Sequence, residues 1–187
     1  MRQLLLLRHA KTERTNPGGD HARRLMEGGR EDAMRMGQFL AREILAPDHA
    51  LVSDATRAME TFEYLGQGIG LRPATEIVPE LYLAQPSSIL EIIHNAPESA
   101  DRLLVIGHNP GLHQLAFDFG QRGPRKLIAA LAAGFPTCCL VVINCETASW
   151  RDVHPATCRL DRYMTAKALR EIHSVPDGLL TEAQDDC

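Results

Sequence analysis

Two arginines and two histidines follow short apolar segments of the chain. Arg8 and His9 end the first segment, Arg57 closely follows the second, and His108 ends the third. Arginine presents a planar fork that pairs with phosphate oxygens and stays charged at any working pH. Histidine can attack phosphorus, which divides one difficult displacement into two easier ones. These residue types therefore predict a site that binds a phosphate dianion and has a nucleophile to attack it.

Strands and helices alternate along the sequence and would position these residues. Continuous apolar runs, typical of strands covered on both faces, occupy residues 3–7, 50–53 and 102–106. Apolar residues at helical spacing predict helices over 30–45 and 56–65, the second ended by Gly66 and Gly68. We expect three further elements: a helix that Ser87 or Ser88 caps, a helix opened by Asn109-Pro110-Gly111, and a late hairpin of residues 138–143 and 149–153.

This alternation predicts an α/β fold, a three-layer α/β/α sandwich with a mostly parallel central sheet. No repeat or linker divides the sequence, so we expect residues 1–187 to form one domain, with a frayed acidic tail at about 178–187. Ligands of open α/β sheets bind outside the carboxyl ends of the strands. The four candidate residues follow three such ends, and we expect them to meet in one crevice.

The amino-acid composition and net charge argue against several classes of protein. Apolar residues make up 44% of the 187 residues and charged residues 24%, which is typical of a soluble globular protein. The net charge of -4 argues against an electrostatic nucleic-acid binder. No apolar run approaches the roughly 20 residues that span a bilayer, and we find no signal peptide at the N-terminus. We therefore expect a cytoplasmic protein whose partners include neither nucleic acid nor membranes.

The cysteines indicate neither a disulfide framework nor a zinc site, because their number is odd and their spacing irregular. We interpret them as small buried side chains in a reducing cytoplasm. No cluster of Asp, His or Cys stands at metal-ligand spacing, so we expect no metal ion and no cofactor. The five cysteines are Cys138, Cys139, Cys145, Cys158 and Cys187.

Four segments, in order along the chain, carry a family resemblance. Residues 7–11, Leu-Arg-His-Ala-Lys, resemble the opening signature of the histidine phosphatase superfamily, and the Ala-Lys continuation is similar to its SixA-type branch of small phosphohistidine phosphatases. Residues 20–25 are similar to the Asp-x-x-Arg-Pro-Leu segment, with Arg24 in place of proline. Residues 53–61 resemble the Ser-x-x-x-Arg-Ala-x-x-Thr segment, and residues 105–111 resemble the second-histidine motif of that branch. The resemblance covers most of the chain.

The resemblance implies a phosphoglycerate mutase-like fold and a metal-independent phosphatase. His9 would be the nucleophile and would become a phosphohistidine during the reaction. The phosphoryl oxygens would be bound by Arg8, Arg57 and His108. Glu80 falls where the superfamily places its general acid. The glycine that commonly follows that segment is missing here, so the alternative for Glu80 is a solvated residue.

The resemblance also bears on the loop at residues 10–29 and on the substrate. For Asp20 and Arg23 we favour a salt bridge that pins the loop over a role as ligands. The implied substrate is phosphohistidine on a protein. Two other functions stay open: a phosphatase of small phosphomonoesters, and a catalytically silent module that binds phosphorylated partners.

Overall fold

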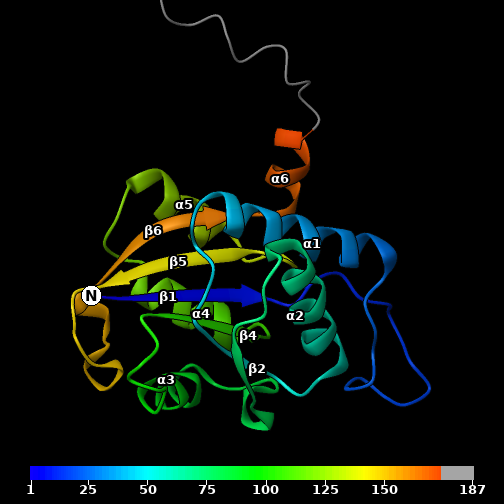
Figure 1. The fold of residues 1–187 in the computed structure, drawn as a ribbon, viewed down its shortest axis with the longest axis horizontal. Coiled ribbons are helices and arrows are strands. Elements are labelled where there is room, and N and C mark those ends of the chain that lie inside the picture. The colour runs from blue at the N-terminus through cyan, green and yellow to red at the C-terminus, as the bar shows by residue number, and fades with distance from the viewer. Residues whose placement is uncertain (174–187) are drawn as a thin grey trace, which may run out of the picture.

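The computed structural model describes residues 1–173, in which a six-stranded sheet is covered by helices on both faces (Figure 1). The predicted three-layer α/β/α sandwich is therefore confirmed, while the predicted tail at about 178–187 lies outside the described residues. The strands are β1 (Arg2–Arg8), β2 (His49–Val52), β3 (Ala74–Ile77), β4 (Arg102–Gly107), β5 (Leu140–Cys145) and β6 (Cys158–Met164). The α-helices are α1 (Glu27–Arg42), α2 (Thr56–Ile69), α3 (Pro86–His94), α4 (Gly111–Phe119), α5 (Arg125–Ala133) and α6 (Ala166–His173).

The strand order of the sheet is β3-β2-β4-β1-β5-β6. β4 pairs in parallel with both β1 and β2, and β3 pairs in parallel with β2. β5 runs antiparallel to β1 and to β6. The sheet is thus mostly parallel, as predicted. Because β4 lies between β1 and β2, the three strands that precede the predicted site residues are neighbours and end at the same edge.

Each face of the sheet packs against three helices. In β1, Leu5 and Leu7 share a core with α1, α2 and α6, while Leu4 and Leu6 share the opposite core with α3, α4 and α5. All four leucines are fully buried. Burial on both faces explains why the strand is a continuous apolar run without alternation. At about 1.5–3 kcal/mol for each buried leucine side chain, β1 contributes strongly to the core.

Helices α1 and α2 cross closely at two glycines. A Cβ on either Gly37 or Gly68 would clash with a backbone carbonyl oxygen of the other helix. The predicted end of the second helix at Gly66 is wrong, since α2 continues to Ile69 and stops at Gly70, whose φ of 79° is left-handed. Gly68, inside α2, therefore serves close packing against α1.

Other local predictions are wrong for identifiable reasons. Neither Ser87 nor Ser88 caps α3, which begins at Pro86, a residue suited to the first helical position. The segment 149–153 is no strand, because Ser149 accepts a hydrogen bond from the backbone N–H of Arg151 and starts the short 3-10 helix η2 (Trp150–Asp152). The strand that pairs with β5 is β6. The elements β3, α5, β6 and α6 were not predicted.

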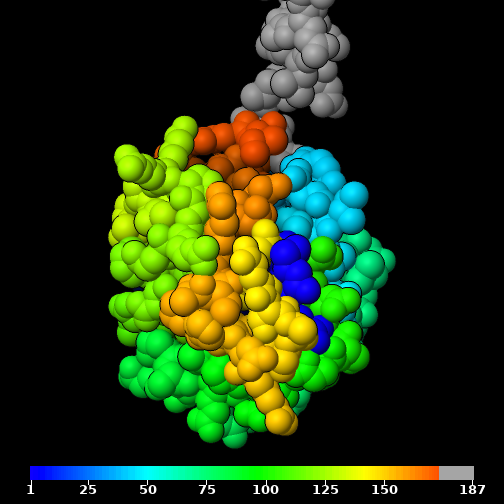
Figure 2. All heavy atoms as spheres, turned by 90° about the vertical axis from the view of Figure 1, so that its left-hand side faces the viewer, coloured from blue at the N-terminus to red at the C-terminus, as the bar shows by residue number. Residues whose placement is uncertain are grey.

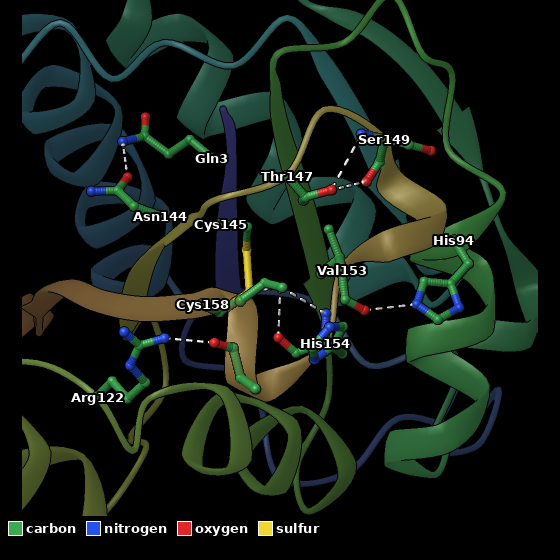
Figure 3. The surroundings of a disulfide bond; sticks show 12 residues. Gln3, His94, Arg122, Asn144, Cys145, Thr147, Ser149, Val153, His154 and Cys158 are labelled. Atoms are coloured by element: carbon green, nitrogen blue, oxygen red, sulfur yellow. Dashed lines mark hydrogen bonds between the residues drawn. A yellow bond between two sulfur atoms is a disulfide. The ribbon is translucent and has the colours of Figure 1, made fainter.

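Cys145 and Cys158 form a disulfide between the end of β5 and the start of β6 (Figure 3). The interpretation of these two residues as unpaired thiols is therefore wrong. Spacing alone did not reveal the pair, because it depends on the register that places the two residues opposite each other. Cys138 and Cys139 are free and buried, as expected, and Cys187 lies outside the described residues.

The disulfide and the predicted site lie at opposite ends of the sheet. Cys145 pairs in register with Arg2, the first residue of β1, whereas Arg8 is its last. Figure 2 shows the face where β1 begins, with the N-terminus beside the segments around residues 140–160. The predicted site therefore lies at the other end of β1, the end that points to the right in Figure 1.

Candidate active site

Four of the five predicted site residues meet at the carboxyl end of the sheet. Arg8 at the end of β1 pairs in register with Gly107 at the end of β4, so His9 and His108 follow neighbouring strands. Their imidazole centroids lie 5.2 Å apart. Arg57 stands in the first turn of α2, and the pKa of each histidine responds to its charge. Residues distant in sequence thus form one cationic cluster.

Three of these residues carry a buried polar atom without a partner. The atoms are Nε of Arg8, Nε of Arg57 and Nδ1 of His108, among six of this kind in the part of the chain that the structure describes. Leaving a buried donor unpaired costs about 1–3 kcal/mol, so each such atom needs an explanation. Acceptor oxygens of a bound ligand are one source of the missing partners.

His9 is held in one tautomer by the backbone. Its Nδ1 lies 2.8 Å from the carbonyl oxygen of Ala10. A carbonyl can only accept, so Nδ1 carries the proton and Nε2 keeps its lone pair. Burial lowers the pKa of His9 to about 4, the hydrogen bond to Ala10 opposes this shift, and the charges of Arg57 and Arg8 add to it. The imidazole is therefore neutral at pH 7 and able to act as a nucleophile.

His108 is also neutral in the empty site. Its side chain is buried, and Nε2 lies 2.8 Å from the hydroxyl oxygen of Ser53. Burial, together with the smaller effects of the neighbouring His9 and Arg57, lowers the pKa of His108 to about 3. A dianion beside the ring would raise this pKa, because a negative charge favours the protonated imidazole.

Arg8 is positioned by the segment between α5 and β5. Its Nη1 donates to the carbonyl oxygen of Phe135 at 2.9 Å, and Nδ2 of Asn109 donates to the same oxygen, also at 2.9 Å. Burial lowers the pKa of Arg8, but a guanidinium stays charged at physiological pH. Sequence reasoning gave Phe135 no part in the site, because its contribution is a backbone atom that carries no sequence signal.

Asp20, from the loop between β1 and α1, binds Arg57. Its carbonyl oxygen accepts from Nη1 at 2.7 Å, and its Oδ2 accepts from Nη2 at 3.0 Å. Its Oδ1 accepts from Nη1 of Arg23 at 2.8 Å, so the predicted salt bridge is present. Hydrogen bonds from Arg23 and Tyr82, with the charge of Arg57, hold the pKa of Asp20 well below its usual range. The contact with Arg57 was not predicted, because it joins residues far apart in sequence.

Tyr82 forms a wall of the site that sequence reasoning missed. Its hydroxyl donates to Oδ2 of Asp20 at 2.7 Å, and its ring stands edge-on to His108 with centroids 5.4 Å apart. The guanidinium carbon of Arg57 lies 5.6 Å from the ring centroid. On the loop side, the ring of His21 lies 4.8 Å from that of Tyr82. The available signal was that Tyr82 follows Glu80 in the same segment.

Glu80 belongs to a different segment from the other four predicted residues and stands two residues before Tyr82. It is exposed in the 3-10 helix η1 (Pro79–Leu81). Its side chain lines a cavity of about 640 Å³ between β3 and α3, together with Glu76 and Glu91. No hydrogen bond or ion pair joins Glu80 to His9 or His108 among the described contacts. The general-acid role of Glu80 stays a prediction.

The described residues offer little to a metal ion. Among residues 1–173, no group of three His, Cys, Asp or Glu side chains could hold one. The positive charge of the site comes instead from guanidinium groups. The same part of the chain has no helix that is long and apolar enough to cross a membrane.

Comparison with known proteins shows where similar chains occur. A family model described as histidine phosphatase superfamily (branch 1) matches residues 4–81. An uncharacterized protein of Mycobacterium tuberculosis (strain ATCC 25618 / H37Rv) is 31% identical over 156 residues, which covers 82% of this chain and 96% of that protein. The phosphohistidine phosphatase SixA of Escherichia coli (strain K12) is 26% identical over 137 residues, covering 70% of this chain and 83% of that protein.

The fold has matching neighbours among solved structures. A candidate phosphohistidine phosphatase SixA from Nakamurella multipartitia superposes with a TM-score of 0.77 at 24% identity, covering 88% of this chain and 95% of that chain. At this identity the likeness concerns the fold. The phosphoglycerate mutase-like architecture implied by the sequence motifs is thereby confirmed.

Proposed function

Because this chain belongs to the histidine phosphatase superfamily, we propose that it is a phosphatase in which His9 attacks phosphorus and carries the phosphoryl group between two steps. The observation that carries this proposal is the set of unpaired buried atoms beside His9. Nε of Arg8, Nε of Arg57 and Nδ1 of His108 are left without partners. A phosphoryl group has three oxygens that accept hydrogen bonds, and it would satisfy all three nitrogens.

The tautomer of His9 supports its role as the nucleophile. With the proton on Nδ1 and bonded to the carbonyl oxygen of Ala10, the lone pair of Nε2 is free to attack. The lowered pKa keeps that lone pair unprotonated at neutral pH. The backbone carbonyl also orients the ring, as the partner of a catalytic histidine commonly does.

The reaction proceeds in two balanced steps. Nε2 of His9 forms a bond to phosphorus while the bond to the leaving group breaks, and the leaving group takes the electron pair and then a proton. Water next attacks phosphorus and loses a proton to the solvent, the bond to Nε2 breaks and returns its electron pair to Nε2, and inorganic phosphate leaves. Arg8, Arg57 and His108 stabilise the charge on the phosphoryl oxygens in both steps.

We propose phosphohistidine on a protein as the substrate. The similarity to the Escherichia coli protein named phosphohistidine phosphatase SixA supports this choice. The leaving imidazole is far less basic than an alkoxide and needs less help from an acid. This fits a site in which the candidate acid Glu80 makes no hydrogen bond to His9 or His108 among the described contacts. A small phosphomonoester remains the second candidate, and its alkoxide leaving group would need the stronger acid.

Trapping the phosphoenzyme tests the mechanism. Wild-type protein mixed with a substrate labelled in its phosphoryl group should acquire an acid-labile, base-stable label, and peptide mapping should locate the label on His9. His9→Ala should abolish the label. His154→Ala is the matched control, because this exposed histidine lies beside the disulfide at the far end of the sheet (Figure 3).

The outcomes separate the competing functions. Label on a residue other than His9, or full turnover by His9→Ala, would exclude the proposed nucleophile. Vanadate binding without any turnover would instead identify a silent phospho-binding module. A panel that compares phosphohistidine peptides with sugar phosphates at equal concentration decides between the two substrate classes, since the proposal requires a higher kcat/KM for the peptides.

A further inference from the structure

We propose that Asp20 is a positioning residue for Arg57: it holds the end of the guanidinium through Nη1 and Nη2 and thereby leaves Nε to bind the phosphoryl group. This inference rests on the proposed function, in which Arg57 binds phosphoryl oxygens. Asp20 itself does not touch the reacting atoms in this scheme. It belongs to the loop between β1 and α1, which the sequence motifs associate with the family but to which the proposed mechanism assigns no role.

The hydrogen bonds define which donors remain. Asp20 accepts at its carbonyl oxygen from Nη1 (2.7 Å) and at Oδ2 from Nη2 (3.0 Å). A guanidinium has five N–H donors, and these two bonds use one from each Nη. Nε is buried and has no partner. Asp20 and a phosphoryl oxygen can therefore bind Arg57 at the same time, on different edges of its plane.

Asp20 is itself held in place from two sides. Oδ1 accepts from Arg23, whose Nε donates to the carbonyl oxygen of Glu13 and whose Nη2 donates to the hydroxyl of Thr12. Oδ2 accepts from the hydroxyl of Tyr82 at 2.7 Å. The carboxylate is half-exposed at 50%, while the Arg57 side chain that it holds is 3% exposed. A residue at the surface thus orders a buried cation.

The same carboxylate oxygen links two walls of the site. Oδ2 of Asp20 is shared by Arg57 and Tyr82, and the guanidinium of Arg57 lies 5.6 Å from the Tyr82 ring centroid. Loss of the carboxylate would remove the bonds from Nη2 of Arg57 and from the Tyr82 hydroxyl, and would leave Arg57 only its bond to the backbone carbonyl oxygen of residue 20. Because the Tyr82 ring lies against His108, a shift of Arg57 or of Tyr82 would change the positions of groups that bind the phosphoryl oxygens.

A competing account would make Asp20 an inhibitor that occupies Arg57 until substrate displaces it. Displacement would break three side-chain hydrogen bonds of Asp20 and a backbone one, with Arg57, Tyr82 and Arg23 as the partners. Because Nε of Arg57 has no partner, a phosphoryl oxygen can bind there without displacing Asp20. The two accounts predict opposite changes in anion affinity when the carboxylate is removed.

The test compares Asp20→Ala, Asp20→Asn and a matched control, Asp54→Asn. Asp54 bonds His21 of the same loop at 2.9 Å but has no recorded bond to Arg57. Asp20→Ala should weaken vanadate binding and lower kcat/KM for an aryl phosphate by about 10-fold to 100-fold, the range for a lost orienting contact. Asp20→Asn keeps one acceptor oxygen and replaces the other with a donor, so it should recover only part of the loss, and the control should match wild type.

A spectroscopic readout separates positioning from simple loss of stability. In wild type, the ¹⁵N–¹H resonance of Arg57 Nε should shift when vanadate is added, and in Asp20→Ala this shift should shrink while thermal melting changes little. Tighter vanadate binding by Asp20→Ala, or an unchanged affinity, would overturn the proposal. These measurements need no turnover, so they stand apart from the phosphoenzyme test: a wild-type protein that binds vanadate without forming phosphoenzyme would refute the mechanism and leave the role of Asp20 measurable.

Discussion

The hydroxyl oxygen of Ser53 lies 2.8 Å from Nε2 of His108, and both side chains are buried. The same oxygen accepts from the backbone N–H of Ala55 at 3.4 Å. We predict that the hydroxyl donates its own proton to Nε2, which leaves the proton of a neutral His108 on Nδ1. Nδ1 is the atom without a partner, so this contact decides whether His108 presents a donor or a lone pair to a phosphoryl oxygen.

Replacing Ser53 tests this assignment. Ser53→Ala should free His108 to change tautomer, and loss of a fixed donor to the phosphoryl group should lower kcat by about 10-fold or more. Ser53→Thr keeps the hydroxyl and is the control. The ¹⁵N shifts of His108, measured at neutral pH, report the tautomer directly. Identical shifts and rates in wild type and Ser53→Ala would show that the hydroxyl does not orient the ring.

The lowered pKa values of His9 and His108 predict how stability depends on pH. In the unfolded chain both side chains titrate near 6.5, whereas in the folded protein they do so at about 4 and about 3. As the pH falls below 6.5, the unfolded state binds protons that the folded state does not, so unfolding becomes easier. His9 alone should cost about 3 kcal/mol between pH 6.5 and 4.

The His9→Gln and His108→Gln variants should lose this dependence stepwise, as measured by urea unfolding across the pH range. Bound vanadate should raise the pKa of His108 in histidine NMR titrations, because an anion favours the imidazolium. A free-protein pKa near 6.5 for either residue would contradict the burial that the structure assigns to them.

The residues that sit directly at strand ends could be predicted from sequence. Arg8, His9 and His108 interrupt apolar runs, and parallel strands end at one edge, so a local pattern fixes their place in the fold. Arg57 could be predicted because it lies in the first turn of the helix that follows β2. The strands and helices near them were recognised for the same reason, since each has a strong hydrophobic pattern.

The contacts that orient these residues could not be predicted. Asp20 reaches Arg57 through a loop without periodicity, and the role of Ser53 depends on the direction of one hydroxyl proton. Phe135 contributes a carbonyl oxygen, which any residue could supply. The disulfide depended in the same way on the pairing of β5 with β6, and the sequence patterns misassigned the partner strand.

The disulfide should stabilise the fold without affecting the site. The 13-residue separation of Cys145 and Cys158 predicts that their crosslink contributes about 2–4 kcal/mol. A Cys145→Ala/Cys158→Ala double variant should therefore unfold at lower urea concentration. Its kcat/KM should equal that of wild type, because the pair lies at the opposite end of β1 from Arg8. Mass mapping that finds both thiols free in purified, unreduced protein would remove the crosslink from this account.

Activity should not depend on a metal ion. Arg8 and Arg57 supply positive charge beside the phosphoryl oxygens, so the proposed steps need no Lewis acid. Turnover of an aryl phosphate should be unchanged after dialysis against excess EDTA. Added Mg²⁺, Mn²⁺ or Zn²⁺ should not increase it. A loss of turnover in EDTA that a divalent ion restores would require a different reaction scheme.

Glu80→Gln tests the general acid and the substrate together. The substitution preserves the size of the side chain and removes its proton, and at this exposed position in η1 it should change stability little. General acid catalysis contributes about 100-fold to 10,000-fold when the leaving group needs a proton. We therefore expect a large loss of kcat on an alkyl phosphate and a small loss on a phosphohistidine peptide.

The difference between the losses of kcat on the two substrates is more informative than the size of either loss. Glu80 lines the cavity between β3 and α3, so a carboxylate that acts on the leaving group would have to reach the site from there once substrate is bound. Glu76→Gln, in the same cavity, is the matched control and should change neither rate. Equal losses on both substrates would mean that Glu80 acts through structure. No loss on either substrate would mean that Glu80 is a solvated surface residue and not the general acid. The acid would then be sought among the residues around Tyr82.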